Sequence, residues 1–78
     1  MEAEAEDYFQ QAITADENNV GAYVAMARLL LRQQRYEEGL DYALAAASAN
    51  PRDYSNRELV KEFRQRIEKA KIEDAPDR

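Results

Sequence analysis

The sequence predicts an all-α fold of four antiparallel helices, and three observations support this prediction. Fourteen of the 78 residues are Ala, the strongest helix former. Only two Gly and two Pro interrupt the chain, so it has few of the turns that a sheet-rich fold needs. Apolar residues recur at intervals of three and four, the period of a helix that buries one face. We expect one domain over 1–73, followed by a frayed tail at 74–78.

The first two helices are expected at about 3–15 and 20–33. Acidic residues crowd the first turn of the first helix, where the helix macrodipole favours negative charge. The polar stretch 16–19 separates the two helices, and Asn18 or Asn19 can cap the second one. The apolar stripe of the second helix consists of Tyr23, Met26, Ala27 and Leu30.

The last two helices are expected at about 36–49 and 55–73. Small residues on one side of the third helix allow a neighbouring helix to approach closely, and Pro51 follows its end. The segment Ser55–Glu58 has the pattern of a capping box that opens the fourth helix. The apolar face of that helix consists of Leu59, Phe63, Ile67 and Ala70.

The segment 20–53 follows a 34-residue pattern of aromatic, large, small and Pro positions. This pattern resembles the tetratricopeptide repeat family, and the resemblance implies an antiparallel helix-turn-helix unit of an α-solenoid. The alternative is an unrelated four-helix bundle in which the alanines fall at these intervals by chance. The residues that carry the resemblance are Tyr23, Met26, Ala27, Leu30, Tyr36, Gly39, Ala43, Ala46 and Pro51.

Two positions of the third helix depart from the family pattern. Ala43 stands where the family usually has a large aromatic residue, and Gly39 stands where it usually has Ala. We expect these changes to thin the packing around the third helix without altering the topology.

The pattern continues at 34-residue steps on both sides of this unit. Ala5, Phe9 and Ala12 match the second helix of a preceding repeat. On the other side most of the buried positions become polar, as in the capping helix that closes such an array. The half repeat at the start leaves two alternatives: the chain is the C-terminal end of a longer array, or another molecule covers the first helix. The polar replacements occur around Val60, at Arg57, Lys61 and Arg64.

Composition argues against several classes of function. The net charge of −5 disfavours a nucleic-acid partner, which requires a basic surface. The chain has no Cys and no His, so it lacks a thiolate nucleophile, a zinc finger and the commonest general base. The acidic segment 16–19 lacks the spacing of a calcium-binding loop. We therefore expect no enzyme, no cofactor and no metal site.

The sequence also bears on location. No apolar run approaches the roughly 20 residues that span a bilayer. The N-terminus is acidic, unlike a signal or transit peptide. We expect a cytoplasmic protein without a membrane partner.

The family resemblance implies a protein-protein interaction module that binds a peptide or a partner helix on its concave face. The first helix of the repeat would place Arg28 and Arg32 one turn apart, where they could hold a carboxylate. The alternative is that both are solvated or pair with Glu58 or Glu62. The complete predicted set is Val24, Arg28, Leu31, Arg32, Glu58 and Glu62.

Self-assembly is a second hypothesis, because a chain this short buries only about 60–65% of its unfolded surface. The apolar face of the first helix would then pack on its copy in a second chain by two-fold symmetry and form a homodimer. That face consists of Ala5, Phe9, Ala12 and Ile13.

Overall fold

The computed structural model describes residues 2–73, which form four α-helices and contain no strand. The predicted all-α fold is therefore confirmed, and the observed helix bounds lie within one residue of the predicted ones. The predicted frayed tail at 74–78 lies outside the described residues. The helices are α1 (Glu2–Ala15), α2 (Val20–Arg32), α3 (Tyr36–Ala49) and α4 (Tyr54–Glu73).

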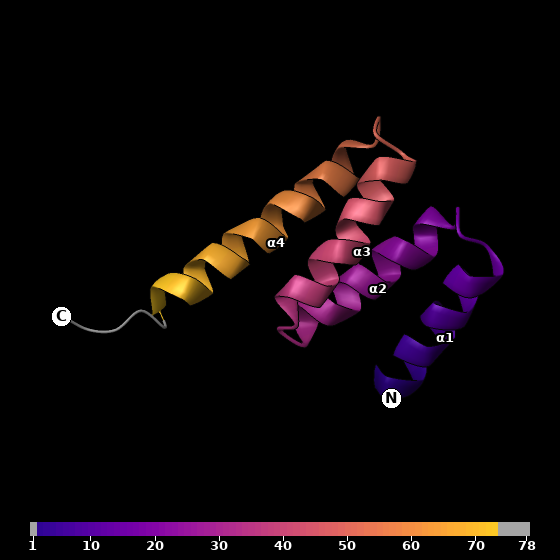
Figure 1. Ribbon diagram of the computed structural model, residues 1–78, viewed down its shortest axis with the longest axis horizontal. Coiled ribbons are helices and arrows are strands. Elements are labelled where there is room, and N and C mark those ends of the chain that lie inside the picture. The colour runs from indigo at the N-terminus through magenta and orange to yellow at the C-terminus, as the bar shows by residue number, and fades with distance from the viewer. Residues whose placement is uncertain (1, 74–78) are drawn as a thin grey trace.

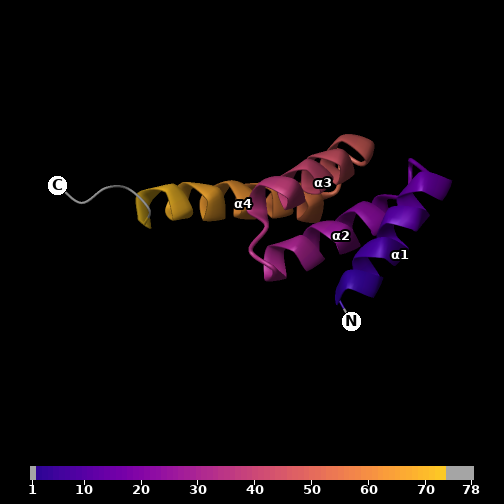
Figure 2. The same cartoon turned by 60° about the horizontal axis from the view of Figure 1, so that its bottom comes forward.

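Each helix packs against the next one along the chain. Short connections return the chain at 16–19, 33–35 and 50–53, so that neighbouring helices meet in hairpins. In Figure 1, α1 and α4 lie at opposite ends of the molecule, with α2 and α3 between them. The view in Figure 2 shows the same order, and in both views the C-terminal half of α4 extends beyond the other helices.

The core is divided into two apolar clusters that meet at α2. The first joins α2, α3 and the first half of α4, and Tyr36 and Leu40 pack against it. The second joins α1 to α2. Tyr42 of α3 packs against both clusters and so links them. The buried members are Ala27, Ala43, Leu59, Val60 and Phe63 in the first cluster, and Met26, Leu29 and Leu30 in the second.

The packing around Gly39 is tight, and the expectation that it would be thin is wrong. A Cβ atom at Gly39 would lie only 2.4 Å from Cε1 of Phe63 and 2.5 Å from its Cζ. The ring of Phe63 has no exposed surface, and neither does Ala43. Phe63 of α4 therefore fills the space that the small residues of α3 leave open.

Side-chain caps define the starts of α2 and α4. Asn19 caps α2, because its Oδ1 accepts a hydrogen bond from the backbone N of Ala22 at 3.0 Å. At α4, Asp53 Oδ1 accepts from the backbone N of Ser55 at 2.8 Å. The predicted capping box at Ser55 is therefore wrong, since Ser55 already lies within the helix.

The connection between α3 and α4 also contains a buried polar residue. Asn56 is buried, and its Nδ2 donates a hydrogen bond to the carbonyl oxygen of Ala46 near the end of α3. This bond fixes the first turn of α4 against the last turn of α3.

The turn between α2 and α3 has the hydrogen bonds of a Schellman motif. The backbone N of Gln34 donates to the oxygen of Leu31, and that of Arg35 donates to the oxygen of Leu30. Gln34 has a φ of 62°, a left-handed conformation that Gly adopts at low cost and other residues do not. The tight turn is therefore formed with some backbone strain.

We expect Gly39→Ala to destabilise the fold by roughly 1–2 kcal/mol. The added methyl group clashes with the enclosed Phe63 ring, at a cost of about 1–3 kcal/mol, which outweighs the helix propensity that Ala gains. Urea unfolding would measure the effect. In a Phe63→Leu background, which removes the clashing ring atoms, the same substitution should cost much less. An equal cost in both backgrounds would contradict the close contact.

We expect Gln34→Gly to stabilise the protein by about 1 kcal/mol. Gly relieves a left-handed strain of about 1–2 kcal/mol and costs part of this gain in unfolded-state entropy. Gln34→Ala is the matched control, because it also removes the side chain but keeps the strain. Urea midpoints should rise only for the Gly variant.

Candidate functional site

The apolar residues of the predicted concave face are Val24 and Leu31 of α2. Both are half-buried and pack against the cluster that contains Leu59 and Phe63 of α4. They thus contribute to the core and also keep part of their surface accessible.

The two Arg residues of the predicted site lie one turn apart on α2. Arg28 and Arg32 are both exposed. On α4, Glu58 is exposed, whereas Glu62 is half-buried and forms an ion pair with Arg66, with Arg66 Nη2 3.5 Å from its Oε2. α2 thus supplies positive charge, and α4 supplies both signs.

A shallow depression of about 430 Å³ lies along α4. It contains Glu58 and Glu62 of the predicted site but none of the four predicted residues of α2. The depression also contains Lys61 and Arg66, which are not part of the predicted site. Arg66 could have been found from the sequence, because its spacing of four residues from Glu62 is typical of a helical ion pair. The residues that line the depression are Ser55, Glu58, Leu59, Lys61, Glu62, Gln65 and Arg66.

The face of α1 predicted for self-association contacts α2 of the same chain. Ala5, Phe9 and Ile13 pack against the buried cluster of α2, and Ala12 is half-buried. Tyr8 lies beside this contact, with 68% of its surface exposed and its ring 5.8 Å from that of Phe9 in an edge-on arrangement. Homodimer formation through this face stays a prediction, and a second chain would meet mainly what α2 leaves uncovered.

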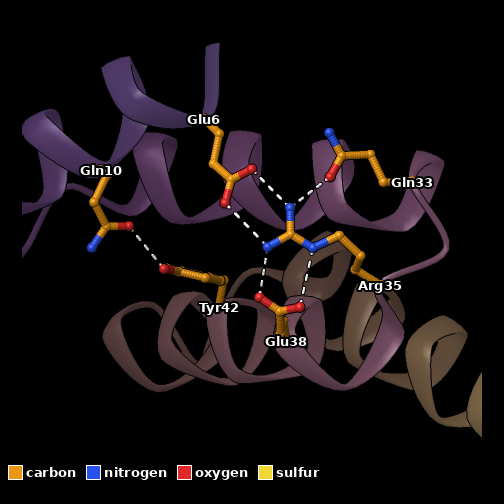
Figure 3. A network of polar contacts seen from close by, with 6 residues as sticks. All are labelled: Glu6, Gln10, Gln33, Arg35, Glu38 and Tyr42. Atoms are coloured by element: carbon orange, nitrogen blue, oxygen red, sulfur yellow. Dashed lines mark hydrogen bonds and ion pairs between the residues drawn. The ribbon is translucent and has the colours of Figure 1, made fainter. Parts of the chain in front are cut away.

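A network of polar contacts centred on Arg35 ties α1 to the turn between α2 and α3 (Figure 3). Its guanidinium donates to both carboxylate oxygens of Glu6, at 2.8 and 3.2 Å, and to both of Glu38, at 3.0 and 2.7 Å. Arg35 Nη1 also donates to the side-chain oxygen of Gln33 at 2.8 Å. One guanidinium therefore bridges two carboxylates from different helices.

These contacts shift the pKa values of Glu38 and Arg35. The hydrogen bonds from Arg35 lower the pKa of Glu38 below its ordinary value of 4.5, and the carboxylates raise the pKa of Arg35. A second polar contact joins α1 to α3, because the hydroxyl of Tyr42 donates to the side-chain oxygen of Gln10 at 2.8 Å (Figure 3). Both contacts lie on the same side of the α1–α2 pair.

Residues 2–73 contain neither a candidate metal site nor a candidate membrane span. In this range no three acidic side chains come together in a way that could hold a metal ion. None of the four helices combines the length and the apolar composition of a membrane span.

The observed geometry is that of a helical-hairpin repeat protein, in which each helix packs mainly on its neighbours along the chain. The family model for the tetratricopeptide repeat matches residues 2–67, and the chain belongs to this family. No curated protein and no solved structure was found to match the chain.

We expect Arg35→Gln to raise the pKa of Glu38 toward its ordinary value, because the charged donors are lost. An NMR titration of the Glu38 carboxyl carbon would measure the shift. Since the pKa of Glu38 is lowered in the folded state, its contact with Arg35 stabilises the fold above the ordinary Glu pKa. This contribution is lost as the pH falls through the lowered value. A Glu38 titration that is the same in both proteins would contradict the bidentate contact.

Proposed function

We propose that this protein is a protein-interaction module that binds an acidic amphipathic peptide or helix on the concave face formed by α2 and α4. Membership of the tetratricopeptide repeat family supports the general role, since proteins of this family bind other proteins. The observation that carries the finer proposal is the pair Arg28 and Arg32, both exposed beside the half-buried Val24 and Leu31.

The chemistry of this surface selects a type of partner. Each guanidinium presents a planar set of donors that matches a carboxylate, so acidic residues one turn apart on a helix suit the pair. The accessible parts of Val24 and Leu31 suit an apolar side chain between them. The mixed charges of α4, which include Glu62 and Arg66, add a second set of polar contacts.

The proposed module also forms the C-terminal end of its array. Arg57, Lys61 and Arg64 are exposed on α4. They lie 34 residues after the stripe residues of the equivalent helix α2, which are Tyr23, Ala27 and Leu30. A polar outer helix of this kind protects the last apolar layer from water and gives a following helix no apolar stripe to cover.

The test is a selection of helical peptides from a random displayed library on the immobilised 78-residue chain. Peptides selected by the wild type should be rich in Asp and Glu at intervals of three or four. Calorimetry should show that Arg28→Glu with Arg32→Glu lowers the affinity for these peptides at least about tenfold, because two charge-assisted contacts become repulsive.

The matched control is Arg57→Glu with Arg64→Glu, which changes the net charge equally on the other side of α4. This control should leave the affinity of the selected peptides nearly unchanged. Equal losses in both variants would indicate an effect of net charge alone, and binding that the Arg28 and Arg32 variant does not weaken would refute the proposed site.

A further inference from the structure

The two helices of the proposed concave face run in the same direction, so their residues can be compared level by level. In Figure 1 and in Figure 2, α2 and α4 both extend from the same end of the molecule towards the other. Equivalent positions of the two helices are 34 residues apart. The three levels pair Val24 with Glu58, Arg28 with Glu62, and Arg32 with Arg66.

The charge of this face changes sign along its length. The first level has a single charge, the exposed carboxylate of Glu58. The middle level has one charge of each sign. The last level has two exposed guanidinium groups, those of Arg32 and Arg66. The face is therefore acidic near the start of the two helices and basic near the end of α2.

The helix macrodipoles favour one direction for a bound helix. α2 ends at Arg32, so the negative end of its macrodipole lies at the basic end of the face. The positive N-terminal end of a partner helix is favoured at that place. Acidic side chains in the first turns of the partner also stabilise the partner helix itself. An antiparallel partner thus has its acidic residues where Arg28 and Arg32 can hold them.

The spacing of the charges sets the spacing in the partner. Val24 and Arg32 are eight residues apart on α2, as are Glu58 and Arg66 on α4. Eight residues of an α-helix rise about 12 Å, which is a little more than two turns. A helix that places one carboxylate at Arg32 and a second, four residues later, at Arg28 reaches the level of Glu58 after four more residues.

We propose that the partner of the concave face is a bipolar helix that binds antiparallel to α2, with Asp or Glu at positions i and i+4 and Lys or Arg near i+8. This inference rests on the proposed function and adds the direction and the charge order of the partner. A parallel partner would need its basic residue in its first turns and its carboxylates near its C-terminus, where its own macrodipole opposes both. The charge order therefore selects among acidic helices, which a pair of Arg residues alone does not.

The test uses the helical peptides that the 78-residue chain selects from the displayed library. In their aligned sequences the carboxylates should precede the basic residue. A nitroxide label at the N-terminus of a selected peptide should broaden most strongly the amide NMR signals of 31–33 and 65–67. A label at the C-terminus should broaden most strongly those of 20–24 and 54–58.

A charge exchange tests the contact with Glu58. Glu58→Lys should lower the affinity for the selected peptides at least about threefold, because an attraction becomes a repulsion. A peptide whose basic residue near i+8 is replaced by Glu should recover this affinity with the Glu58→Lys variant. The matched control is Asp41→Lys, which changes the net charge equally at an exposed position of α3, outside the concave face. This control should leave the affinity nearly unchanged.

Two results would overturn the proposal and leave the proposed function intact. One is labelling that reports a parallel helix, or both directions equally, for peptides whose affinity depends on Arg28 and Arg32. The other is an equal effect of Glu58→Lys and Asp41→Lys, which would remove the basic residue from the partner. Peptides whose affinity does not depend on Arg28 and Arg32 would instead refute the concave site, and this inference with it.

Discussion

The contact between Phe63 and Gly39 determines how α3 and α4 fit together, and the rest of the fold follows from it. If α3 had a larger residue in place of Gly39, the ring of Phe63 would prevent the two helices from approaching so closely. That ring has no exposed surface. The same close approach puts the first turn of α4 beside the last turn of α3, where Asn56 binds the carbonyl oxygen of Ala46. The orientation of α4 then sets the second wall of the proposed concave face.

α1 is held by a different kind of interface. Its apolar residues pack mainly on α2, and polar contacts join Glu6 to Arg35 and Gln10 to Tyr42. Ion pairs and hydrogen bonds that stay partly open to solvent contribute little free energy each. We infer that α1 is the least stably attached of the helices that the structure describes.

The sequence allowed the helices to be predicted well because their periodicity and end signals are local. Asn19 caps α2 and Pro51 follows α3, as expected from their chemistry. The start of α4 was harder, since Asp53 and Ser55 are both good capping residues and only the backbone conformation decides between them. Arg35 lies 29 residues from Glu6, and no local pattern connects the two. The concave-face residues were assigned from helical phase, which gives a direction but not the extent of burial of Val24 and Leu31.

The packing at Gly39 and Ala43 was mispredicted for a reason that explains how this short array keeps its helices in order. On α1 the aromatic residue is Phe9, which packs against the α2 cluster containing Leu29. One repeat later Ala43 replaces Phe9 and Phe63 replaces Leu29, so the aromatic ring has moved across the interface to the other helix. The α1–α2 interface and the α3–α4 interface therefore each contain one Phe ring. The ring comes from the first helix of the pair in α1–α2 and from the second helix in α3–α4. The ring of Phe63 would meet that of Phe9 if α4 packed on α1, while Leu29 would leave a void beside Ala43 if α2 took the place of α4. This alternation favours one order of helices over the others, because overpacking and cavities both cost free energy.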